Sequence, residues 1–347
     1  MKIIIDLDDT ITIDTSDRDY SNKHVNKDVV AALRQAKRQG YSIHIFTARN
    51  IRTYENDLEA IHKHTKPIAE EWLRRNDVPY DELTFGKPWC EKGGFYVDDK
   101  LVSIDEFVFK FLGPFESKTF DIVVPFYNEQ DNVARTHKEL KKLERLLNIN
   151  RYIYIQNGSE DDTAARLIAL SKNDSKIYIE HIDINKGYGH GFKKGFKASN
   201  ADYILTNHSD CQFDAYAFFI THMEEFLNQK TVDAIFPKRL NRPNISVLRT
   251  KILQKVLQVL IGKTEIKDFN GQPKIFCRRY IPSSLPNDFC LDLAIFLEFQ
   301  KPNFNSISLP IIEKERHKGI SSWVGSKKKQ FAIIWRYISY AYTQKRL

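Results

Sequence analysis

The sequence predicts an α/β protein built from two consecutive α/β domains, and three observations support this prediction. At 347 residues with 42% hydrophobic side chains, the chain can bury two ordinary cores. Short apolar runs alternate with longer stretches of helical periodicity, a pattern typical of a parallel sheet covered on both faces by helices. The alternation stops once, at Gly113-Pro114, and then starts again, so the domain boundary is expected there.

In the first half, the expected elements begin with a buried strand at Ile3–Ile5. A helix follows from Asn26, whose side chain can cap it, to Gly40, a residue favoured just after a helix. The other expected elements are a strand at 42–46, a helical stretch to about Arg75 interrupted at Pro67, short strands at 83–85 and 95–97, and a helix ending near Leu112. This order predicts a first domain at 1–113 and a linker at 114–119.

The second half repeats the alternation from a strand at 121–125. The strands expected after it are 152–155, 176–182, 203–206 and 232–236, and the expected helices are 130–147, 160–171, 190–199 and 215–228. We therefore expect a second α/β domain at 120–326, followed by a basic, aromatic C-terminal helix at 327–347.

The charge is shared unevenly between the two halves. Residues 1–116 carry 17 Lys and Arg against 21 Asp and Glu, so the remaining residues carry 36 against 24. A basic second half predicts an anionic partner, which could be the phosphates of a donor, a phospholipid surface or nucleic acid.

Nothing in the sequence indicates export or a membrane span. The apolar run Ile3–Ile5 is interrupted by Asp6 and is too short for a signal peptide. No stretch approaches the roughly 18 apolar residues of a membrane-spanning helix. We therefore expect a cytoplasmic protein. The four cysteines lack the spacing of a disulfide framework or a zinc site, so we expect reduced and mostly buried thiols.

Acidic residues follow the first predicted strand. Asp6 and Asp8 lie at its carboxyl end, where open α/β sheets bind their ligands. A carboxylate can attack a phosphoryl group when a divalent cation offsets the repulsion, and a second carboxylic acid can protonate the leaving oxygen. Asp-rich segments after strands are also ordinary turns, so this segment alone does not decide the function.

Further polar residues follow the later strands of the first half: Thr47, then Lys87, then Asp98-Asp99. The ordered set of an Asp-x-Asp-x-Thr motif, a threonine, a lysine and an acidic pair resembles the haloacid dehalogenase superfamily of phosphatases. The resemblance covers about residues 1–112. It implies a Rossmann-like phosphatase domain that acts on a small phosphorylated metabolite, and the short insertions imply no cap domain or a minimal one.

The resemblance also implies a role for each matching residue. Asp6 would be the nucleophile, and Asp8 the general acid and base. Thr47 and Lys87 would hold the phosphoryl group. The expected Mg²⁺ ligands are Asp6, Asp8, Asp98 and Asp99.

In the second half, four turns after predicted strands carry polar residues or glycine. These turns are Tyr127-Asn-Glu129, Gln156-Asn-Gly-Ser-Glu-Asp-Asp-Thr163, Asn185-Lys-Gly-Tyr-Gly-His-Gly191 and His208-Ser-Asp-Cys-Gln-Phe-Asp214. Glycines before a helix allow backbone amides to approach phosphate, although helix caps and tight turns use the same residues.

As an ordered set, these turns resemble family 2 glycosyltransferases, in particular the branch that transfers sugars to polyprenyl phosphate. The similarity spans about residues 120–325, with a weaker match at Arg316–Ser322. It implies a GT-A fold, a nucleotide-diphosphate sugar as donor and inversion of the anomeric centre. The residues implied around the donor are Pro125, Tyr127, Glu129 and Asn157 for the nucleotide, Lys186 and Gly187 for its phosphates, and His208, Asp210 and Gln212 for a metal ion.

Two positions depart from the family pattern. Gln156-Asn157 stands where at least one aspartate is usual, so base recognition is expected to differ from the uracil or guanine pattern. His208 replaces the first aspartate of the metal motif. An imidazole suits Mn²⁺ better than Mg²⁺, and a His208 that binds no metal is an equal alternative. We therefore expect Mn²⁺ or Mg²⁺ in the transferase domain.

The sequence is consistent with two kinds of acceptor, a sugar hydroxyl and a lipid phosphate. A sugar hydroxyl requires a carboxylate base, for which Asp268 and Asp292 are candidates, with Asp292 taken as the catalytic residue. A lipid phosphate requires cations instead, and the candidates are Arg239, Arg242, Arg316 and Lys318. The stripe of Phe331, Ile334, Trp335 and Ile338 fits either an interfacial membrane helix, hence a peripheral position at the inner face of the membrane, or a helix docked on its own domain.

Together these motifs predict a bifunctional enzyme of cell-surface polysaccharide assembly, such as capsule or lipopolysaccharide. One rival is a phosphatase whose degenerate transferase domain serves as a membrane or partner module. Another is a phosphatase that trims nucleic acid ends, which would require a groove lined by basic and aromatic side chains. The transferase motifs argue against the second rival, so no nucleic acid partner is expected.

Overall fold

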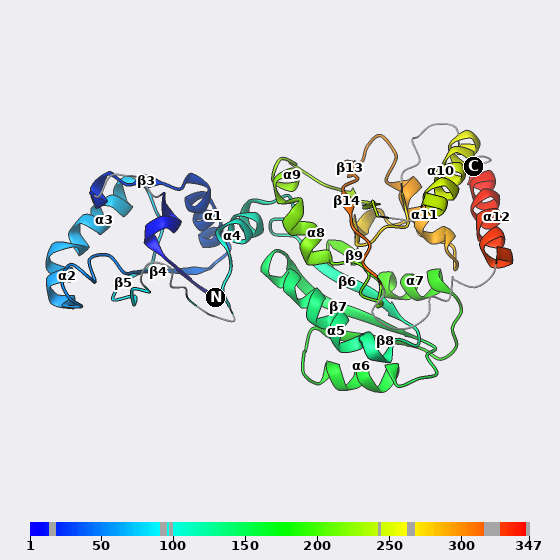
Figure 1. The fold of residues 1–347 in the computed structure, drawn as a ribbon, viewed down its shortest axis with the longest axis horizontal. Helices are drawn as coiled ribbons and strands as arrows, with labels where there is room; N and C mark the ends of the chain where they lie inside the picture. Colours follow the sequence, from blue (N-terminus) through cyan, green and yellow to red (C-terminus); the bar gives the residue numbers. More distant parts are fainter. Residues whose placement is uncertain are drawn as a thin grey trace. The chain divides into compact units, whose positions relative to one another are not determined.

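The computed structural model describes residues 1–13, 19–90, 96, 100–241, 244–261, 268–315 and 327–344. The chain forms two compact units, Met1–Glu116 and Ser117–Leu347, and each is described here by itself (Figure 1). Both units alternate strands and helices, as the sequence predicts. Asp98 and Asp99, positions 95 and 97 of the expected strand, Arg242 and the segment Arg316–Ser322 lie outside the described residues.

The N-terminal unit is built on a three-stranded parallel sheet in the order β1-β4-β5. Its strands are β1 (Lys2–Ile5), β4 (Ser42–Thr47) and β5 (Glu82–Phe85), with a hairpin of β2 (Thr12–Ile13) and β3 (His24–Val25). Its helices are α1 (Lys27–Arg38), α2 (Leu58–His64), α3 (Lys66–Arg75) and α4 (Ile104–Leu112). Because the three strands are parallel, the residues that follow them lie at one edge of the sheet.

Local sequence signals explain the ends of these helices. Asn26 accepts a hydrogen bond from the Val29 backbone N–H at 3.3 Å and so caps α1. Gly40 has φ of +84°, which a glycine adopts at little cost after a helix. Pro67 lies at the start of α3, where its missing N–H does no harm. The predicted break at Pro67 is confirmed.

The C-terminal unit is built on a seven-stranded mixed sheet in the order β13-β10-β12-β9-β6-β7-β8. Its central strands β6 (Thr119–Phe126), β7 (Asn148–Asn157), β8 (Ile177–Ile182) and β9 (Tyr203–Thr206) are parallel. The outer strands are β10 (Ala234–Ile235), β12 (Lys274–Cys277) and β13 (Ser306–Ile307), and β12 runs antiparallel to both of its neighbours. Strands β11 (Lys238–Arg239) and β14 (Pro310–Ile311) form a separate parallel pair.

The helices of this unit are α5 (Val133–Lys141), α6 (Thr163–Ser171), α7 (Tyr188–Ala198), α8 (Ala215–Thr221), α9 (Met223–Leu227), α10 (Asn244–Ile261), α11 (Cys290–Glu298) and α12 (Lys327–Gln344). Two predicted helices are divided. The one expected at 130–147 tightens into a 3₁₀ turn at Lys142–Arg145, and both Leu143 and Leu147 are buried. The one expected at 215–228 breaks at His222, whose Nε2 hydrogen-bonds the Pro310 carbonyl at 2.7 Å.

The C-terminal helix α12 packs against α10, and Figure 1 shows the two helices side by side. Tyr337 and Ala341 of α12 are buried, which supports the prediction of a helix docked on its own domain. Trp335 of the same helix is 70% exposed, so the helix also presents an aromatic side chain to solvent. Among the described residues, no helix combines the length and apolarity needed to cross a bilayer.

The cysteines are free thiols, and Cys277 and Cys290 are buried. Cys90 and Cys211 are only partly buried, so the expectation of mostly buried thiols holds for two of the four.

Candidate functional sites

The N-terminal site begins with the acidic turn after β1. The Asp6 carboxylate accepts a hydrogen bond from the Leu7 backbone N–H at 2.8 Å. Asp9 adopts the left-handed conformation, with φ of +56°, and its N–H donates to the Thr12 hydroxyl at 3.1 Å. The turn is thus held by its own side chains, and Asp8 stays 30% exposed at its side chain.

Lys87 joins this turn from the end of β5. Its ammonium forms an ion pair and hydrogen bond with Asp6, and its backbone N–H donates to the Thr47 carbonyl at 3.2 Å. Gly86, with φ of +99°, turns the chain just before it. The Lys87 ammonium also lies 4.4 Å from the centre of the Tyr96 ring. The predicted nucleophile and the predicted phosphate-binding lysine are therefore neighbours.

The end of β4 supplies the partners of Asp8. The Thr47 hydroxyl donates to an Asp8 oxygen at 3.3 Å. The Arg49 Nε donates to both Asp8 oxygens, at 2.9 and 3.1 Å. Sequence reasoning noted Arg49 only as a neighbour of Thr47 and gave it no role. Its position two residues after a predicted phosphate-binding threonine was the available signal.

The structure thus brings together four of the six residues predicted for this site: Asp6, Asp8, Thr47 and Lys87. Within the described residues, no group of three or more His, Cys, Asp or Glu side chains could hold a metal ion. The two acidic residues expected to complete a Mg²⁺ site, Asp98 and Asp99, are outside the described residues. The Mg²⁺ site therefore stays a prediction.

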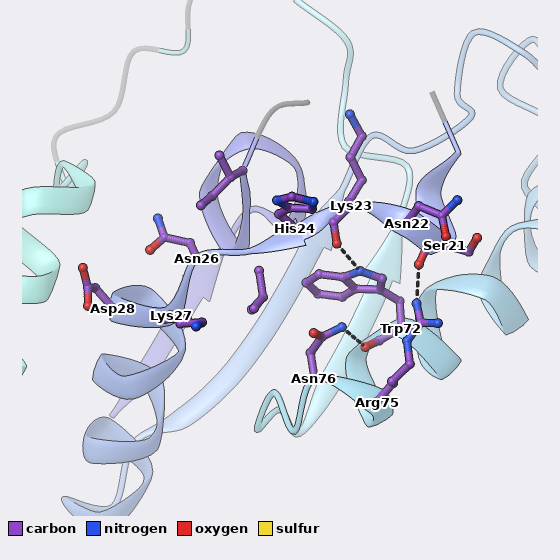
Figure 2. A pocket seen from close by; sticks show the side chains of 12 residues that line it. Ser21, Asn22, Lys23, His24, Asn26, Lys27, Asp28, Trp72, Arg75 and Asn76 are labelled. Carbon is purple, nitrogen blue, oxygen red and sulfur yellow. Dashed lines mark hydrogen bonds between the residues drawn. The ribbon is translucent and has the colours of Figure 1, made fainter. Parts of the chain in front are cut away.

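The hairpin that follows the acidic turn borders a hollow of about 810 Å³ against α3 (Figure 2). Trp72 lies on its inner side, 1% exposed, and its indole N–H donates to the Lys23 carbonyl at 2.9 Å. Four basic side chains, Lys23, His24, Lys27 and Arg75, line the hollow with Asp28. The sequence analysis did not single out this hollow.

In the C-terminal unit, the turns after β6 and β7 are tied to each other. The Asn128 N–H donates to the Ser159 hydroxyl at 3.1 Å, and the Glu160 N–H donates back to the Asn128 side chain at 2.9 Å. The Glu129 N–H donates to the Thr163 hydroxyl at 2.9 Å. These reciprocal bonds fix two turns that the sequence assigned to nucleotide binding, and they leave the Tyr127 side chain 40% exposed.

Asn157, at the end of β7, is almost fully buried, and its Oδ1 has no hydrogen-bond partner among the described residues. Gly158 follows with φ of +72°, and a Cβ there would lie 2.3 Å from the Asn185 backbone nitrogen. Only glycine fits this close approach. Asn157 is therefore held beside the turn that carries Lys186 and Gly187.

The glycines that open α7 have a packing reason. A Cβ at Gly189 would lie 2.5 Å from the Asp288 carbonyl oxygen, and one at Gly187 would lie 3.0 Å from the Asn287 carbonyl oxygen. The His190 N–H also donates to Asn287 O at 3.0 Å. Close packing against residues 286–288 thus requires these glycines, in addition to any approach of phosphate to the helix start.

His208, at the end of β9, is held by Gln272. The Gln272 Oε1 accepts from the Thr206 hydroxyl at 2.8 Å and from the Lys274 backbone N–H at 3.1 Å. Its amide nitrogen must therefore point the other way, where it lies 3.4 Å from His208 Nε2. Burial lowers the pKa of His208. Nε2 of a neutral His208 thus accepts from Gln272, and metal binding through this atom would require that contact to break.

Tyr188 connects His208 to Asp292. Its hydroxyl donates to the Asp292 carboxylate at 3.0 Å and lies 3.4 Å from His208 Nε2. Burial, with the Asp292 charge beside it, raises the pKa of Tyr188 well above its usual value, so the hydroxyl keeps its proton. Sequence reasoning did not identify Tyr188, which looked like part of a glycine-rich helix start.

Lys274 of β12 completes this cluster. Its ammonium lies 3.1 Å from Asp292 Oδ1, with the two side chains 1% and 8% exposed. Burial lowers the pKa of Lys274, and the Asp292 charge opposes that effect. An ion pair so well shielded from water needs both partners, because either one alone would be an uncompensated buried charge. The sequence did not indicate Lys274 as a site residue, because the antiparallel strand β12 brings it next to Asp292 only in the folded protein.

The other candidate base, Asp268, is paired with Arg239. Two guanidinium nitrogens donate to its two oxygens at 2.8 and 3.0 Å. The Arg239 side chain, expected to face a lipid phosphate, also lies 3.8 Å from Glu313. Both candidate bases are therefore held in buried salt bridges, Asp268 with Arg239 and Asp292 with Lys274.

The metal motif continues from His208 to Asp210 and Gln212. The Asp210 side chain is buried and accepts from the Gln212 backbone N–H at 3.2 Å. The Gln212 side chain donates to the Lys314 carbonyl at 3.2 Å, while the Lys314 N–H donates to the Gln212 carbonyl at 2.8 Å. The segment that follows β14 is thus tied to the predicted metal motif through Lys314 and Gln212.

The C-terminal unit matches a model of a known protein family. Residues 121–281 match the family model described as glycosyl transferase family 2. Over 217 residues, the chain is 25% identical to the undecaprenyl-phosphate 4-deoxy-4-formamido-L-arabinose transferase of Klebsiella pneumoniae (strain 342), covering 59% of this chain and 63% of that protein. It is also 25% identical over 213 residues to the putative glycosyltransferase CsbB of Bacillus subtilis (strain 168), covering 58% of this chain and 61% of that protein. The chain thus spans less than two thirds of the length of these relatives.

Among solved structures, the glucosyl-3-phosphoglycerate synthase from Mycobacterium tuberculosis in complex with UDP has a similar fold. The TM-score is 0.50 at 16% identity, covering 67% of this chain and 81% of that one. The same enzyme in complex with Mn²⁺, UDP and glucosyl-3-phosphoglycerate gives a TM-score of 0.50 at 14% identity, covering 66% and 80%. A protein of known crystal structure from Vibrio cholerae is 49% identical over 31% of this chain and 86% of its own, with a TM-score of 0.30.

Proposed function

We propose, from the premise that residues 121–281 belong to family 2 of the glycosyltransferases, that the C-terminal unit moves a sugar from a nucleotide donor to an acceptor. The observation that carries this proposal is the order β9-β6-β7 in the parallel part of the sheet. That order sets the turns with Asp210, Glu129 and Asn157 at one edge, where α/β sheets bind nucleotides.

The donor in this proposal is a nucleoside diphosphate sugar with Mn²⁺ or Mg²⁺. Asp210 and Gln212 would hold the ion, which supplies positive charge to the departing diphosphate when bound. Asn157 and Glu129 would contact the nucleotide. The Mycobacterium tuberculosis enzyme of similar fold was solved with Mn²⁺ and UDP, which makes this pair the first combination to test.

A thermal-shift experiment on the full chain tests the donor site. UDP-, GDP-, CMP- and dTDP-sugars would each be added with Mn²⁺ and with Mg²⁺, because a bound ligand raises the melting temperature by mass action. We expect a metal-dependent shift with one nucleotide, abolished in Asp210→Ala and kept in Glu225→Ala, a change on the remote helix α9. A protein that no nucleotide sugar stabilises would contradict the proposal and favour a degenerate transferase domain.

For the acceptor, we favour a polyprenyl phosphate. The curated relative from Klebsiella pneumoniae acts, by its name, on undecaprenyl phosphate. A phosphate acceptor is already anionic and needs no base, whereas a saccharide hydroxyl would need Asp292. Substitution of Asp292 therefore distinguishes the two kinds of acceptor. Because Asp292→Asn alone would leave the Lys274 ammonium buried and unpaired, the comparison uses Asp292→Asn combined with Lys274→Met. This double variant should keep transfer to a lipid phosphate within about tenfold, and a loss of about 1000-fold would indicate a hydroxyl acceptor.

A lipid acceptor requires contact with a membrane surface, for which α10 and α12 are suited. Exposed apolar residues on the described parts of these helices include Ile252, Val259, Trp335 and Tyr342, which are 56%, 76%, 70% and 47% exposed. Aromatic and aliphatic side chains of this kind favour the interface of a bilayer. We expect Trp335→Ser to weaken sedimentation with anionic liposomes. Ile168→Ser, which alters a 54% exposed side chain on α6, should leave sedimentation unchanged.

For the N-terminal unit, we propose hydrolysis of a small phosphomonoester. The pairs Asp6–Lys87 and Asp8–Thr47, which lie at the ends of the three parallel strands, support this chemistry. An Asp6 oxygen would attack phosphorus, the bond to the leaving oxygen would break, and Asp8 would give that oxygen a proton. Asp8 would then take a proton from the water that cleaves the aspartyl phosphate. A Mg²⁺ ion bound by Asp6 would offset the repulsion between carboxylate and phosphate.

Phosphate release from a panel of phosphomonoesters, with and without Mg²⁺, tests this activity. The activity should disappear in Asp6→Asn and persist in Asp77→Asn, since Asp77 is 90% exposed at its side chain and lies outside the cluster. If the Asp6→Asn protein kept its activity, the proposed mechanism would be wrong.

The presence of both units in one chain supports consecutive steps of one pathway, and we place that pathway in the assembly of cell-surface polysaccharide. The prediction is that the product of one unit, or the phosphorylated precursor of its substrate, is handled by the other. Incubation of each unit's products with the full chain tests this link. If neither product were ever consumed, the two activities would be unrelated.

A further inference from the structure

Arg49 is almost completely buried, at 2% exposure, at the carboxyl end of β4. Its backbone is fixed by the Arg49 N–H, which donates to the Thr47 hydroxyl at 3.1 Å. The same hydroxyl donates to Asp8, so Arg49 belongs to the cluster that forms the N-terminal site. An arginine in this position is costly, because burying a guanidinium requires partners for its donors.

The described structure provides partners for only part of the guanidinium. Its Nε donates to both Asp8 oxygens, at 2.9 and 3.1 Å. The two terminal nitrogens, Nη1 and Nη2, are shielded from solvent and have no hydrogen-bond partner among the described residues. Unsatisfied buried donors of this kind destabilise the folded protein. A site that retains them is suited to a ligand that satisfies them.

The geometry restricts what that ligand is. The Tyr20 ring covers one face of the guanidinium, with the central carbon 4.6 Å from the ring centre. A ligand must therefore meet the planar edge formed by Nη1 and Nη2. Two parallel N–H donors in a plane match two oxygens of a phosphate or carboxylate.

The surroundings favour phosphate. Asp8 contacts both Arg49 and Thr47, the residue predicted to hold the phosphoryl group, and Lys87 enters the same edge of the sheet beside Asp6. Arg49 and Lys87 thus bring two cations to this edge, paired with the carboxylates of Asp8 and Asp6 respectively.

We propose that Nη1 and Nη2 of Arg49 bind two oxygens of the phosphoryl group, so that Arg49 is a second phosphate-binding cation beside Lys87. This inference rests on the phosphatase function proposed above. The competing interpretation is that Arg49 only positions Asp8. The two interpretations differ in one respect, since a purely positioning arginine would not change the affinity for phosphate.

Isothermal titration of inorganic phosphate into the full-length Asp6→Asn protein with Mg²⁺ separates these interpretations. Adding Arg49→Lys to this background should weaken phosphate binding by at least about tenfold, because lysine keeps the charge but loses the two-pronged contact. The control Arg52→Lys changes an exposed arginine near the same strand and should leave the affinity unchanged. An unchanged affinity in Arg49→Lys would overturn the proposal.

Steady-state kinetics of the otherwise wild-type protein provide a second readout. Loss of a phosphate contact should raise KM for a phosphomonoester more than it lowers kcat, whereas a positioning role would lower kcat alone. If Arg49→Lys did not fold, a crystal structure of Asp6→Asn with phosphate would decide the question: phosphate oxygens within about 3.2 Å of Nη1 and Nη2 support the proposal, and their absence there contradicts it.

The outcomes also separate this inference from the phosphatase function. Binding of phosphate that depends on Arg49, in a protein that hydrolyses no phosphomonoester, would retain the site and reject the proposed activity. If the protein hydrolysed phosphomonoesters but its affinity for phosphate did not depend on Arg49, the proposed activity would stand and the proposal about Arg49 would be rejected.

Discussion

The N-terminal and C-terminal sites hold their charged groups at different depths. In the N-terminal unit, the Lys87 and Asp6 side chains are 16% and 29% exposed, and the partners follow three neighbouring parallel strands. In the C-terminal unit, the Lys274 and Asp292 side chains are 1% and 8% exposed, and a strand that runs antiparallel to its neighbours brings the lysine to a helix. The first arrangement fits groups that react with a ligand from solvent. The second fits a cluster whose shape must be kept.

The largest expected effect concerns the exposed cluster. Asp6→Asn removes the proposed nucleophile, so phosphate release should fall by at least about 1000-fold while the fold is retained. The thermal shift caused by a nucleotide sugar should not change, because Asp6 belongs to the other compact unit. Parallel assays of both activities on this variant provide the measurement. A loss of both activities would mean that the two units do not work separately.

The next effect concerns the stability that each ion pair supplies. Lys274→Met leaves the Asp292 charge buried and unpaired, so the C-terminal unit should lose about 3 kcal/mol of unfolding free energy. The matched change Lys87→Met in the less buried pair should cost the N-terminal unit about 1 kcal/mol or less. Urea unfolding measures the unfolding free energy of both units. The transition of each unit is identified as the one that shifts when that unit's ligand is added.

A double variant controls for the loss of packing. Lys274→Met with Asp292→Leu removes both charges and should recover most of the lost stability, because no unpaired charge remains. Equal costs for the two single lysine variants would contradict the difference in depth between the sites.

The smallest effect concerns a buried histidine on α5. His137 is 7% exposed, with Nδ1 2.9 Å from the Tyr154 hydroxyl. Burial lowers the pKa of His137 below its usual 6.5, against the opposing charge of Asp174. The unfolded chain therefore binds a proton before the folded one does, and stability should fall as the pH drops below 6.5. For one proton the slope is at most about 1.4 kcal/mol per pH unit.

Unfolding of the C-terminal unit at pH 7.5, 6.5 and 5.5 measures this slope. His137→Gln cannot take up the proton and should show a flatter profile over the same range. Identical profiles for the wild-type protein and His137→Gln would show that His137 has the same pKa in both states.

The sequence predicted the N-terminal cluster well because its chemistry is local. Asp6, Thr47 and Lys87 each follow a strand directly, and parallel strands bring their ends to one edge. Arg49 was missed as a functional residue, because the sequence does not show that a guanidinium is buried with two unsatisfied nitrogens.

In the C-terminal unit, prediction was less complete for a physical reason. Asp292 was chosen from two aspartates, but the pairing of Asp268 with Arg239 became visible only in the folded chain. Tyr188 and Lys274 meet Asp292 across 104 and 18 residues. Tyr188 holds a position in the glycine-rich turn 185–191 to which no role was assigned, and Lys274 belongs to none of the quoted motifs. The glycines at 187 and 189 looked like a phosphate-binding turn, while the structure adds a packing requirement against residues 286–288.

The sequence by itself determined the α/β class, the positions of most strands and helices, and the turns that carry Asp6, Glu129 and Asp210, because periodicity and turn chemistry are local properties. The tertiary structure alone decided which side chains are buried and which partners they meet. The buried donors of Arg49 and the Lys274–Asp292 pair arise from the packing of distant segments, and the free energy of a charge depends on that packing more than on its place in the chain.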